Sequence, residues 1–126
     1  MALAFDTIVV DCADPVMVAT FWAAAMGFEI VEADPDDTFV DDPTGATKGM
    51  FFQKVPEPKV AKNRVHIDVR PTGSMAEEVE RLKGLGATVR GFIEEGGSFW
   101  TQMRDPEGNE FCVLRGPQDG WSPDEL

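Results

Sequence analysis

His66 is the only histidine in this sequence of 126 residues, and two polar side chains, Asp68 and Arg70, follow it at alternate positions. Histidine is the one side chain whose unperturbed pKa lets it titrate near neutrality. His66 is therefore the candidate catalytic residue, as a general base or as a hydrogen-bond donor to a ligand. A structural histidine on the polar face of a strand is the alternative. Asp68 could orient His66 or bind a polar ligand.

Three other side chains could also bind or attack a small molecule. Cys112 could be a nucleophile beside His66, because an imidazolium lowers the pKa of a thiol. The favoured alternative for Cys112 is a small buried side chain between two apolar neighbours. Trp100 could stack on a planar ligand or pack in the core. Arg70 could bind an anion, although an ion pair at the rim of a sheet is favoured.

Two strand-like segments, 7–11 and 66–70, must position these residues. In the second, Val65, Ile67 and Val69 alternate with the polar residues, which is the period of a strand with one apolar and one polar face. Each segment precedes a helix, so the apolar faces should carry the helices. The polar faces, which hold Thr7 in one segment and His66 in the other, should point elsewhere.

The two helices are marked by their ends. Asp14 is a good N-cap, Pro15 suits the first helical position and Gly27 suits a left-handed C-cap. Phe21 and Trp22 in this first helix are predicted to lie in the core. The second helix begins with a capping box at 74–77 and ends at the glycines 84 and 86.

Three further strand candidates follow each helix, so the chain reads twice as strand, helix and three strands. These candidates are 28–32, 38–41 and 50–54 in the first half, and 88–93, 99–103 and 110–114 in the second. The sequence thus predicts one domain, 1–126, with modules at about 1–55 and 64–115, a linker at 56–63 and a tail at 116–126. The tail is polar except for Trp121, which could pack back on the domain or touch a partner subunit.

Composition narrows the function classes. A net charge of −12 argues against nucleic acid and anionic membranes as partners, because both repel an acidic protein. Two cysteines are too few for a disulfide scaffold. The longest uncharged run, 15–28, is too short to span a bilayer. With no secretory segment in view, we expect a reducing, cytoplasmic setting.

This order of elements, with the sequences CADPVMVATFWAAAMGFEIV and DPEGNEFCVL, resembles the vicinal oxygen chelate superfamily. That superfamily includes glyoxalases, bleomycin-resistance proteins, extradiol dioxygenases and methylmalonyl-CoA epimerases. The resemblance is greatest to its branch of short bacterial glyoxalase-like proteins, in which segments such as VPEPKVAKNRVHIDVRP recur, and it extends to about residue 115. It implies an α+β fold in which two paired βαβββ modules form a curled mixed sheet around a cavity.

The resemblance also implies where metal-dependent members hold their metal, on the first and last strands of each module. Counting from the helix-start aspartate and from the turn aspartate carries two of those positions onto Thr7 and Cys112. Their counterparts in the other module are His66, at an offset of one residue, and Gln53, which lies opposite Cys112 when the two halves are aligned. Threonine is a poor ligand, and Cys112 replaces the usual glutamate. Gln53 and His66 stay as metal candidates, but two neutral ligands bind weakly, so we expect no bound metal. We expect these four positions, with Asp68 and Trp100, to contact a small ligand instead.

The resemblance therefore implies a protein that binds a small organic molecule in the cavity between its modules. If it is an enzyme, it would use the lyase, isomerase or oxygenase chemistry of the superfamily, with lyase chemistry favoured. The alternative is a metal-free protein that sequesters its ligand without catalysis, as bleomycin-resistance proteins do. A structural or regulatory partner protein is a third reading. Relatives often form dimers, so we expect a homodimer.

Overall fold

The computed structural model describes residues 2–125 and divides after Lys59 into two compact units. Each unit contains a strand, a helix and three further strands, in that order along the chain. The predicted α+β class and the duplicated βαβββ module are confirmed. No helix in the described part of the chain is long and apolar enough to cross a membrane.

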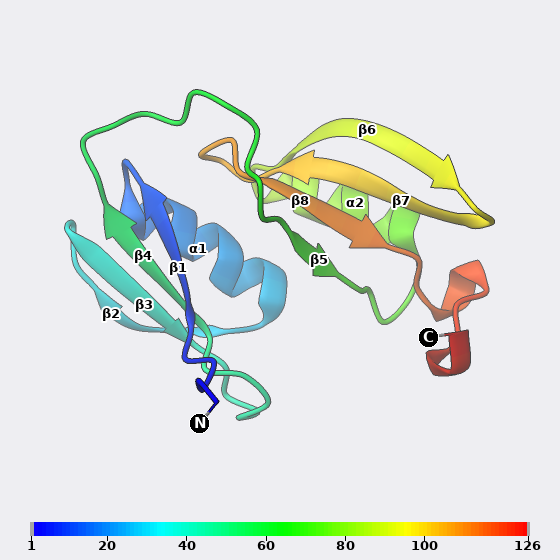
Figure 1. Ribbon diagram of the computed structural model, residues 1–126, viewed down its shortest axis with the longest axis horizontal. Coiled ribbons are helices and arrows are strands. Elements are labelled where there is room, and N and C mark those ends of the chain that lie inside the picture. The colour runs from blue at the N-terminus through cyan, green and yellow to red at the C-terminus, as the bar shows by residue number, and fades with distance from the viewer. Residues whose placement is uncertain (1, 126) are drawn as a thin grey trace. The chain divides into compact units, whose positions relative to one another are not determined.

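The first unit is a four-stranded mixed sheet with one helix against it (Figure 1). Strand order across the sheet is β1-β4-β3-β2, with β1 parallel to β4 and the other pairs antiparallel. Its elements are β1 (Ile8–Cys12), α1 (Pro15–Met26), β2 (Glu29–Ala33), β3 (Asp37–Asp41) and β4 (Met50–Lys54).

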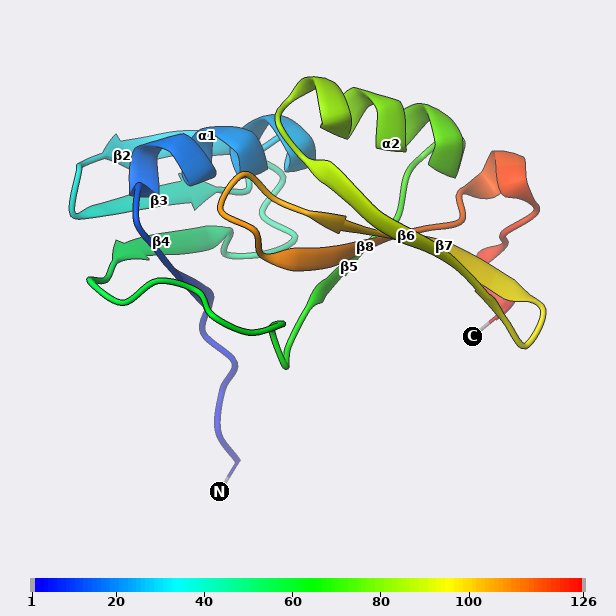
Figure 2. The ribbon, with the colours of Figure 1, turned by 90° about the horizontal axis from the view of Figure 1, so that it is seen from above.

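The second unit repeats this topology, with strand order β5-β8-β7-β6 and β5 parallel to β8. Figure 2 shows α2 lying along one side of this sheet, which leaves the opposite side of β5, β8 and β7 to other contacts. The elements of this unit are β5 (Ile67–Val69), α2 (Met75–Gly84), β6 (Thr88–Glu95), β7 (Ser98–Arg104), β8 (Glu110–Leu114) and the 3₁₀ turns η1 (Pro117–Asp119) and η2 (Pro123–Glu125).

Both helices begin at the side chains that the sequence indicated. The Asp14 carboxylate accepts a hydrogen bond from the backbone N–H of Met17 at 3.1 Å, and the Ser74 hydroxyl accepts one from Glu77 at 3.2 Å. These bonds satisfy backbone donors that have no partner within the first turn of a helix. Gly27 ends α1 in the left-handed conformation, with φ of 71°.

Each unit has a core between its helix and one face of its sheet. Phe21 and Trp22 are both buried on α1, as predicted, and their rings meet edge to face with centroids 5.2 Å apart. In the second unit, Leu82 of α2 is buried together with Met103 and Phe111 of the sheet. Burial of this kind fixes which face of β5, β7 and β8 the helix covers.

The prediction that Val65 shares the apolar strand face is wrong. Strand β5 begins only at Ile67, and Val65 precedes it with 85% of its surface exposed. A strand of three residues has too few ladder bonds to extend the alternating pattern back to Val65. Ile67 and Val69 do keep the alternation, since both are half-buried while Asp68 between them is exposed.

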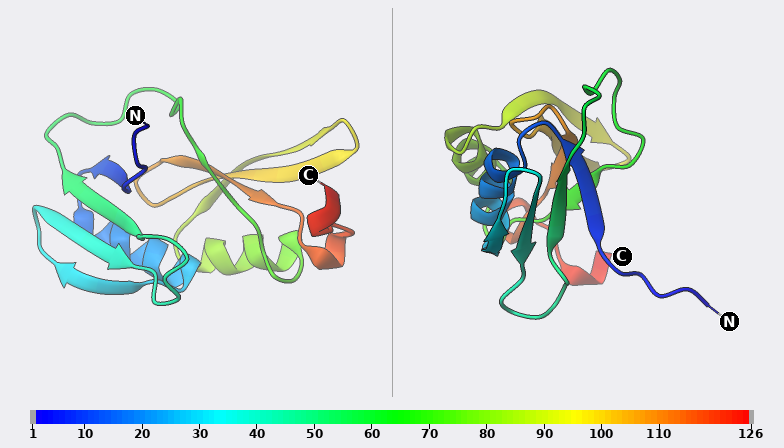
Figure 3. Two further views of the ribbon diagram at one scale, coloured as in Figure 1. Left: turned by 60° about the horizontal axis from the view of Figure 1, so that its bottom comes forward. Right: turned by 90° about the vertical axis from the view of Figure 1, so that its left-hand side faces the viewer.

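The segment after β8 returns to the start of α2 (Figure 3). Oδ2 of Asp119 accepts hydrogen bonds from the backbone N–H groups of Met75, at 2.7 Å, and Gly116, at 2.9 Å. The backbone N–H of Gln118 donates to the carbonyl of Gly73 at 3.2 Å. These bonds hold the tail against the end of the sheet, so Trp121 packs back on its own unit.

Candidate functional site

Neighbouring strands of the second unit bring one set of side chains to the face of the sheet opposite α2. In the sheet register Asp68 of β5 pairs with Cys112 of β8, and Cys112 pairs with Gln102 of β7. Leu114 pairs in the same way with Trp100. Because side chains alternate between the faces of a strand, these residues share one face while their sequence neighbours point toward the helix.

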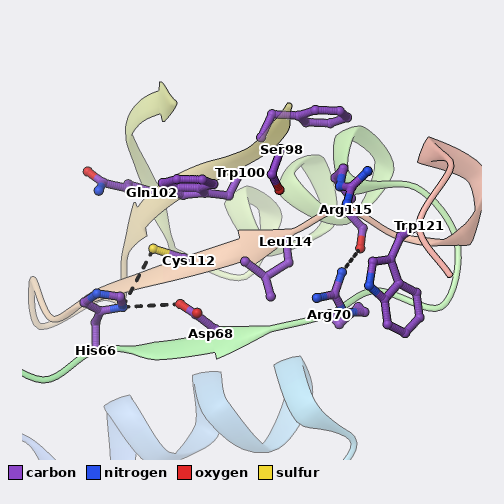
Figure 4. Close-up of a pocket in the computed structure, with 11 residues that line it drawn as sticks. His66, Asp68, Arg70, Ser98, Trp100, Gln102, Cys112, Leu114, Arg115 and Trp121 are labelled. Carbon is purple, nitrogen blue, oxygen red and sulfur yellow. Dashed lines mark hydrogen bonds and ion pairs between the residues drawn. The ribbon is translucent and has the colours of Figure 1, made fainter. Parts of the chain in front are cut away.

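A pocket of about 410 Å³ lies over this face. Its volume falls within the range of small-molecule sites in proteins. Figure 4 shows His66, Asp68 and Cys112 at one end, Leu114 and Trp100 between, and Arg70 with Trp121 at the other end. The lining residues are His66, Asp68, Arg70, Ser98, Phe99, Trp100, Gln102, Cys112, Leu114, Arg115 and Trp121.

The single histidine lies against a carboxylate and a thiol. Nδ1 of His66 is 3.3 Å from Oδ1 of Asp68 and 3.8 Å from Sγ of Cys112. His66 and Asp68 are exposed to solvent, with 40% and 51% of their side-chain surfaces accessible, whereas Cys112 is buried. The imidazole therefore has one edge on protein groups and another available to a ligand.

The thiol at this end of the pocket is held in its neutral form. Burial, together with the nearby negative charge of Asp68, raises the pKa of Cys112 to about 11. A reactive cysteine needs the opposite shift, because the thiolate is the nucleophile. This environment makes Cys112 a poor nucleophile near neutral pH, in agreement with the structural interpretation favoured from its apolar neighbours Phe111 and Val113.

The contact with Asp68 also selects one form of the imidazole. An ionised carboxylate only accepts hydrogen bonds, so Nδ1 carries the proton when it bonds to Oδ1 of Asp68. Nε2 of His66 then keeps its lone pair, and no residue in the described range 2–125 occupies it. A carboxylate that orients an imidazole in this way is the arrangement of a general base.

The family resemblance raises the question of a metal at this end of the pocket. His66, Asp68 and Cys112 offer one nitrogen, one oxygen and one sulfur donor, all within 4.8 Å of one another. Tetrahedral zinc with bonds of about 2.0–2.3 Å separates its donors by roughly 3.3–3.6 Å, close to the spacings around Nδ1. The three residues therefore supply the donor types of an open zinc site, with the two spacings from Nδ1 close to those that zinc requires. Zinc bound there would act as a Lewis acid and lower the pKa of a bound water.

The opposite end of the pocket carries positive charge. Nη1 of Arg70 donates a hydrogen bond to the carbonyl oxygen of Arg115 at 2.7 Å, and the Arg70 guanidinium lies 4.0 Å from the centre of the Trp121 ring. The guanidinium of Arg115 lies 5.7 Å from the ring centre of Phe99. The predicted rim ion pair of Arg70 is absent among the described residues, where its partners are this carbonyl and this ring.

The predicted site residues divide between the two units. His66, Asp68, Trp100 and Cys112 line the same pocket in the second unit. Thr7 and Gln53 belong to the first unit. The Thr7 hydroxyl donates to the carbonyl of Gly49 at 3.5 Å, and Gln53 is exposed on β4.

Some residues that line the pocket are not predicted as site residues from the sequence. Gln102 follows Trp100 on the same strand face, and the same alternation that pointed to Asp68 could have found it. Arg115 had no local signal, because its place depends on the parallel pairing of β5 with β8. The sequence predicts Asp68 as a partner for His66, and the structure adds that its carboxylate is a third possible metal donor.

Solved structures with this fold come from proteins of different activity. A fosfomycin resistance protein of Listeria monocytogenes, complexed with Mn(II) and a dihydroxypropylphosphonic acid, superposes with a TM-score of 0.74 at 15% identity, covering 94% of this chain and 96% of its own. Lactoylglutathione lyase of Agrobacterium tumefaciens gives 0.64 at 18%, covering 95% and 98%. The bleomycin-binding protein of Streptomyces verticillus gives 0.62 at 19%, covering 92% and 99%.

These identities are low enough that the structures establish the fold and leave the ligand open. No curated protein matches the chain. Residues 7–114, in contrast, match the family described as "Glyoxalase-like domain", and the matched segment includes both modules with their sheets and helices. The chain therefore belongs to the glyoxalase-like domain family.

Proposed function

We propose that this protein binds a small organic molecule in the pocket over β5, β7 and β8, and that His66 accepts a proton from it. The observation that supports this proposal most directly is the contact of Nδ1 of His66 with the Asp68 carboxylate at 3.3 Å. This contact favours the tautomer that leaves Nε2 as a proton acceptor. The neutral Cys112 thiol beside it adds a weak hydrogen-bond donor and no competing negative charge.

The binding half of this proposal is tested by filling the pocket. Leu114 lies in the middle of it, so Leu114→Trp should occupy the space that a ligand needs. Compounds that raise the melting temperature of the wild-type protein in a thermal-shift panel should lose that effect in the variant. Glu80→Trp, on the exposed side of α2, is the matched control and should keep it. Equal binding by all three proteins would show that this pocket is not the site.

The proton-transfer half is tested with a compound that binds. A base at Nε2 should exchange an acidic C–H proton of the bound molecule for deuterium in D₂O, which mass spectrometry detects. His66→Gln should keep binding and lower the exchange rate by about 100-fold or more. Binding without exchange in the wild-type protein would favour the alternative, in which the protein sequesters its ligand without catalysis.

Zinc-assisted chemistry is the second candidate, favoured by the three-donor geometry at His66, Asp68 and Cys112. Elemental analysis of protein purified without chelator distinguishes the two mechanisms. The metal-free mechanism predicts less than about 0.1 metal ion per chain, because a binding site should otherwise be filled in stoichiometric amounts. Stoichiometric zinc that is lost in both His66→Ala and Cys112→Ala would instead support the metal-assisted mechanism.

We also propose that the protein is a homodimer, as the family resemblance implies. Light scattering coupled to size-exclusion chromatography should give twice the chain mass of 13.8 kDa. A mass equal to one chain at micromolar concentration would overturn this proposal and leave the pocket proposal intact, because every lining residue belongs to the second unit of one chain.

A further inference from the structure

We infer that the ligand is a small organic acid whose carboxylate or phosphonate group binds Arg70 and Arg115, with its opposite end at His66. This inference rests on the proposed function, because it names the chemical class of molecule for that same pocket. The supporting observation is that two guanidinium groups lie at the end of the pocket away from the imidazole.

The two arginines meet because of the sheet topology. Strands β5 and β8 are parallel neighbours with Val69 paired to Val113, so their C-terminal ends lie side by side at the same end of the sheet. Arg70 follows β5 by one residue and Arg115 follows β8 by one residue. Two positive side chains therefore reach one end of the pocket from adjacent strand ends.

Arg70 is positioned by groups that do not neutralise it. The backbone carbonyl of Arg115 holds Nη1 at 2.7 Å, and the Trp121 ring lies under the guanidinium at 4.0 Å. No carboxylate among the described residues lies within ion-pair distance of Arg70. A guanidinium has five N–H donors, so several remain for an oxyanion, which it binds in a two-pronged geometry.

The side chains that line the pocket have a net charge of opposite sign to that of the whole chain. The protein has a net charge of −12, yet the pocket is lined by two arginines and a single carboxylate, Asp68. Asp68 lies at the imidazole end, where His66 Nδ1 contacts it. An anionic ligand group is therefore attracted to the arginine end and repelled from the other, which gives the ligand one orientation.

The middle of the pocket is apolar and sets the length of the ligand. Trp100 and Leu114 are paired in the sheet between the two ends and offer an indole ring and an aliphatic side chain. Arg70 is four positions after His66, which in an extended chain is roughly 13 Å between Cα atoms. A molecule that reaches both ends thus has an oxyanion, an apolar or aromatic middle and an acidic proton at its far end.

Matched probes test the charge of the ligand. Hydrocinnamate, its uncharged amide and phenylethylphosphonate share a phenyl ring and a short chain, and differ in the group offered to the arginines. Titration by ¹H–¹⁵N NMR should give binding of at least one anion that is about tenfold tighter than that of the amide, since a charge-assisted hydrogen bond is worth about that factor. The stronger anion identifies the carboxylate or the phosphonate as the preferred group. If neither anion binds, the inference is overturned.

Variants then assign the effect to the arginines. Arg70→Gln and Arg115→Gln should each weaken the anion by about tenfold or more and leave the amide unchanged. Arg70→Lys should lose less anion affinity than Arg70→Gln, because lysine keeps the positive charge but lacks the paired N–H donors of the guanidinium. Arg81→Gln on α2 is the control and should change nothing, since Arg81 pairs with Glu78 away from the pocket. The NMR spectra also show whether each variant is folded.

The outcomes separate this inference from the proposed function. If the amide binds as tightly as the anions, and neither arginine variant discriminates between them, the anionic class is wrong while the pocket remains a binding site. If Leu114→Trp leaves the binding of every probe unchanged, the pocket itself is wrong and both proposals fail.

Discussion

Nδ1 of His66 lies 3.3 Å from Oδ1 of Asp68, two residues further along the chain. In water a neutral imidazole prefers its proton on Nε2, but a carboxylate acceptor at Nδ1 favours the other tautomer. This relationship decides which nitrogen of the only histidine could take a proton from a ligand.

The tautomer of His66 can be measured directly. In neutral His66, long-range ¹H–¹⁵N NMR should show a protonated Nδ1 and an unprotonated Nε2, because Asp68 accepts the Nδ1 proton. Asp68→Ala removes the acceptor and should shift the population toward protonated Nε2. Since the chain has one histidine, the assignment is unambiguous. A wild-type spectrum with Nε2 protonated would contradict the proposed orientation of the base.

Cys112 should make the stability of the protein depend on alkaline pH. Its pKa is raised to about 11 in the folded protein by burial and by Asp68, above the ordinary thiol value of 9.0. Between these values the unfolded chain loses the thiol proton first, so folding stability falls as pH rises from about 9 to about 11. The contribution is fully present below pH 9.

Urea denaturation of the wild type and of Cys112→Ala across this pH range checks the effect. The free energy of unfolding of the wild type, relative to the variant, should decrease between pH 9 and 11 and level off above. Asp68→Asn removes the nearby negative charge and should make the decrease smaller. A difference between wild type and Cys112→Ala that stays constant over this range would show that the thiol pKa is not raised.

The fold could be predicted from local signals, and the structure shows why. Helix α1 was marked by a capping aspartate, a proline at the first position and a left-handed glycine, and it runs from Pro15 to Met26. These signals act within a few residues, so they are visible in the sequence. The alternating pattern wrongly predicts that Val65 belongs to the strand. The residue at which β5 begins depends on its pairing with β8, which no local pattern reports.

Only part of the candidate site could be predicted in the same way. His66 and Asp68 were identified because alternation along one strand places them on one face. The positive end of the pocket was missed, since Arg115 and Trp121 reach Arg70 through strand pairing and the return of the tail. Contacts of this kind join residues far apart in the sequence, so residue types and spacing do not reveal them.

The tail should loosen when its anchor to α2 is removed. Oδ2 of Asp119 accepts hydrogen bonds from Met75 and Gly116, so Asp119→Ala leaves two backbone donors without a carboxylate. We expect a loss of about 1–3 kcal/mol in the free energy of unfolding and a changed indole ¹H–¹⁵N NMR signal of Trp121. Asp124→Ala, exposed in the same tail, is the control and should change neither. An unmoved Trp121 signal in Asp119→Ala would show that other contacts hold the tail.

The core beneath the pocket should carry much of the stability of the second unit. Phe111 lies on β8 next to Cys112 but points toward α2, with 1% of its surface exposed. Phe111→Ala removes a whole ring from a packed interior and should lower the free energy of unfolding by about 3–5 kcal/mol, as measured by urea denaturation. Val65→Ala is the control: with 85% of Val65 exposed, we expect a change within about 0.5 kcal/mol. A loss below about 1 kcal/mol for Phe111→Ala would mean that α2 does not close over this face of the sheet, and the assignment of the opposite face to the pocket would fail with it.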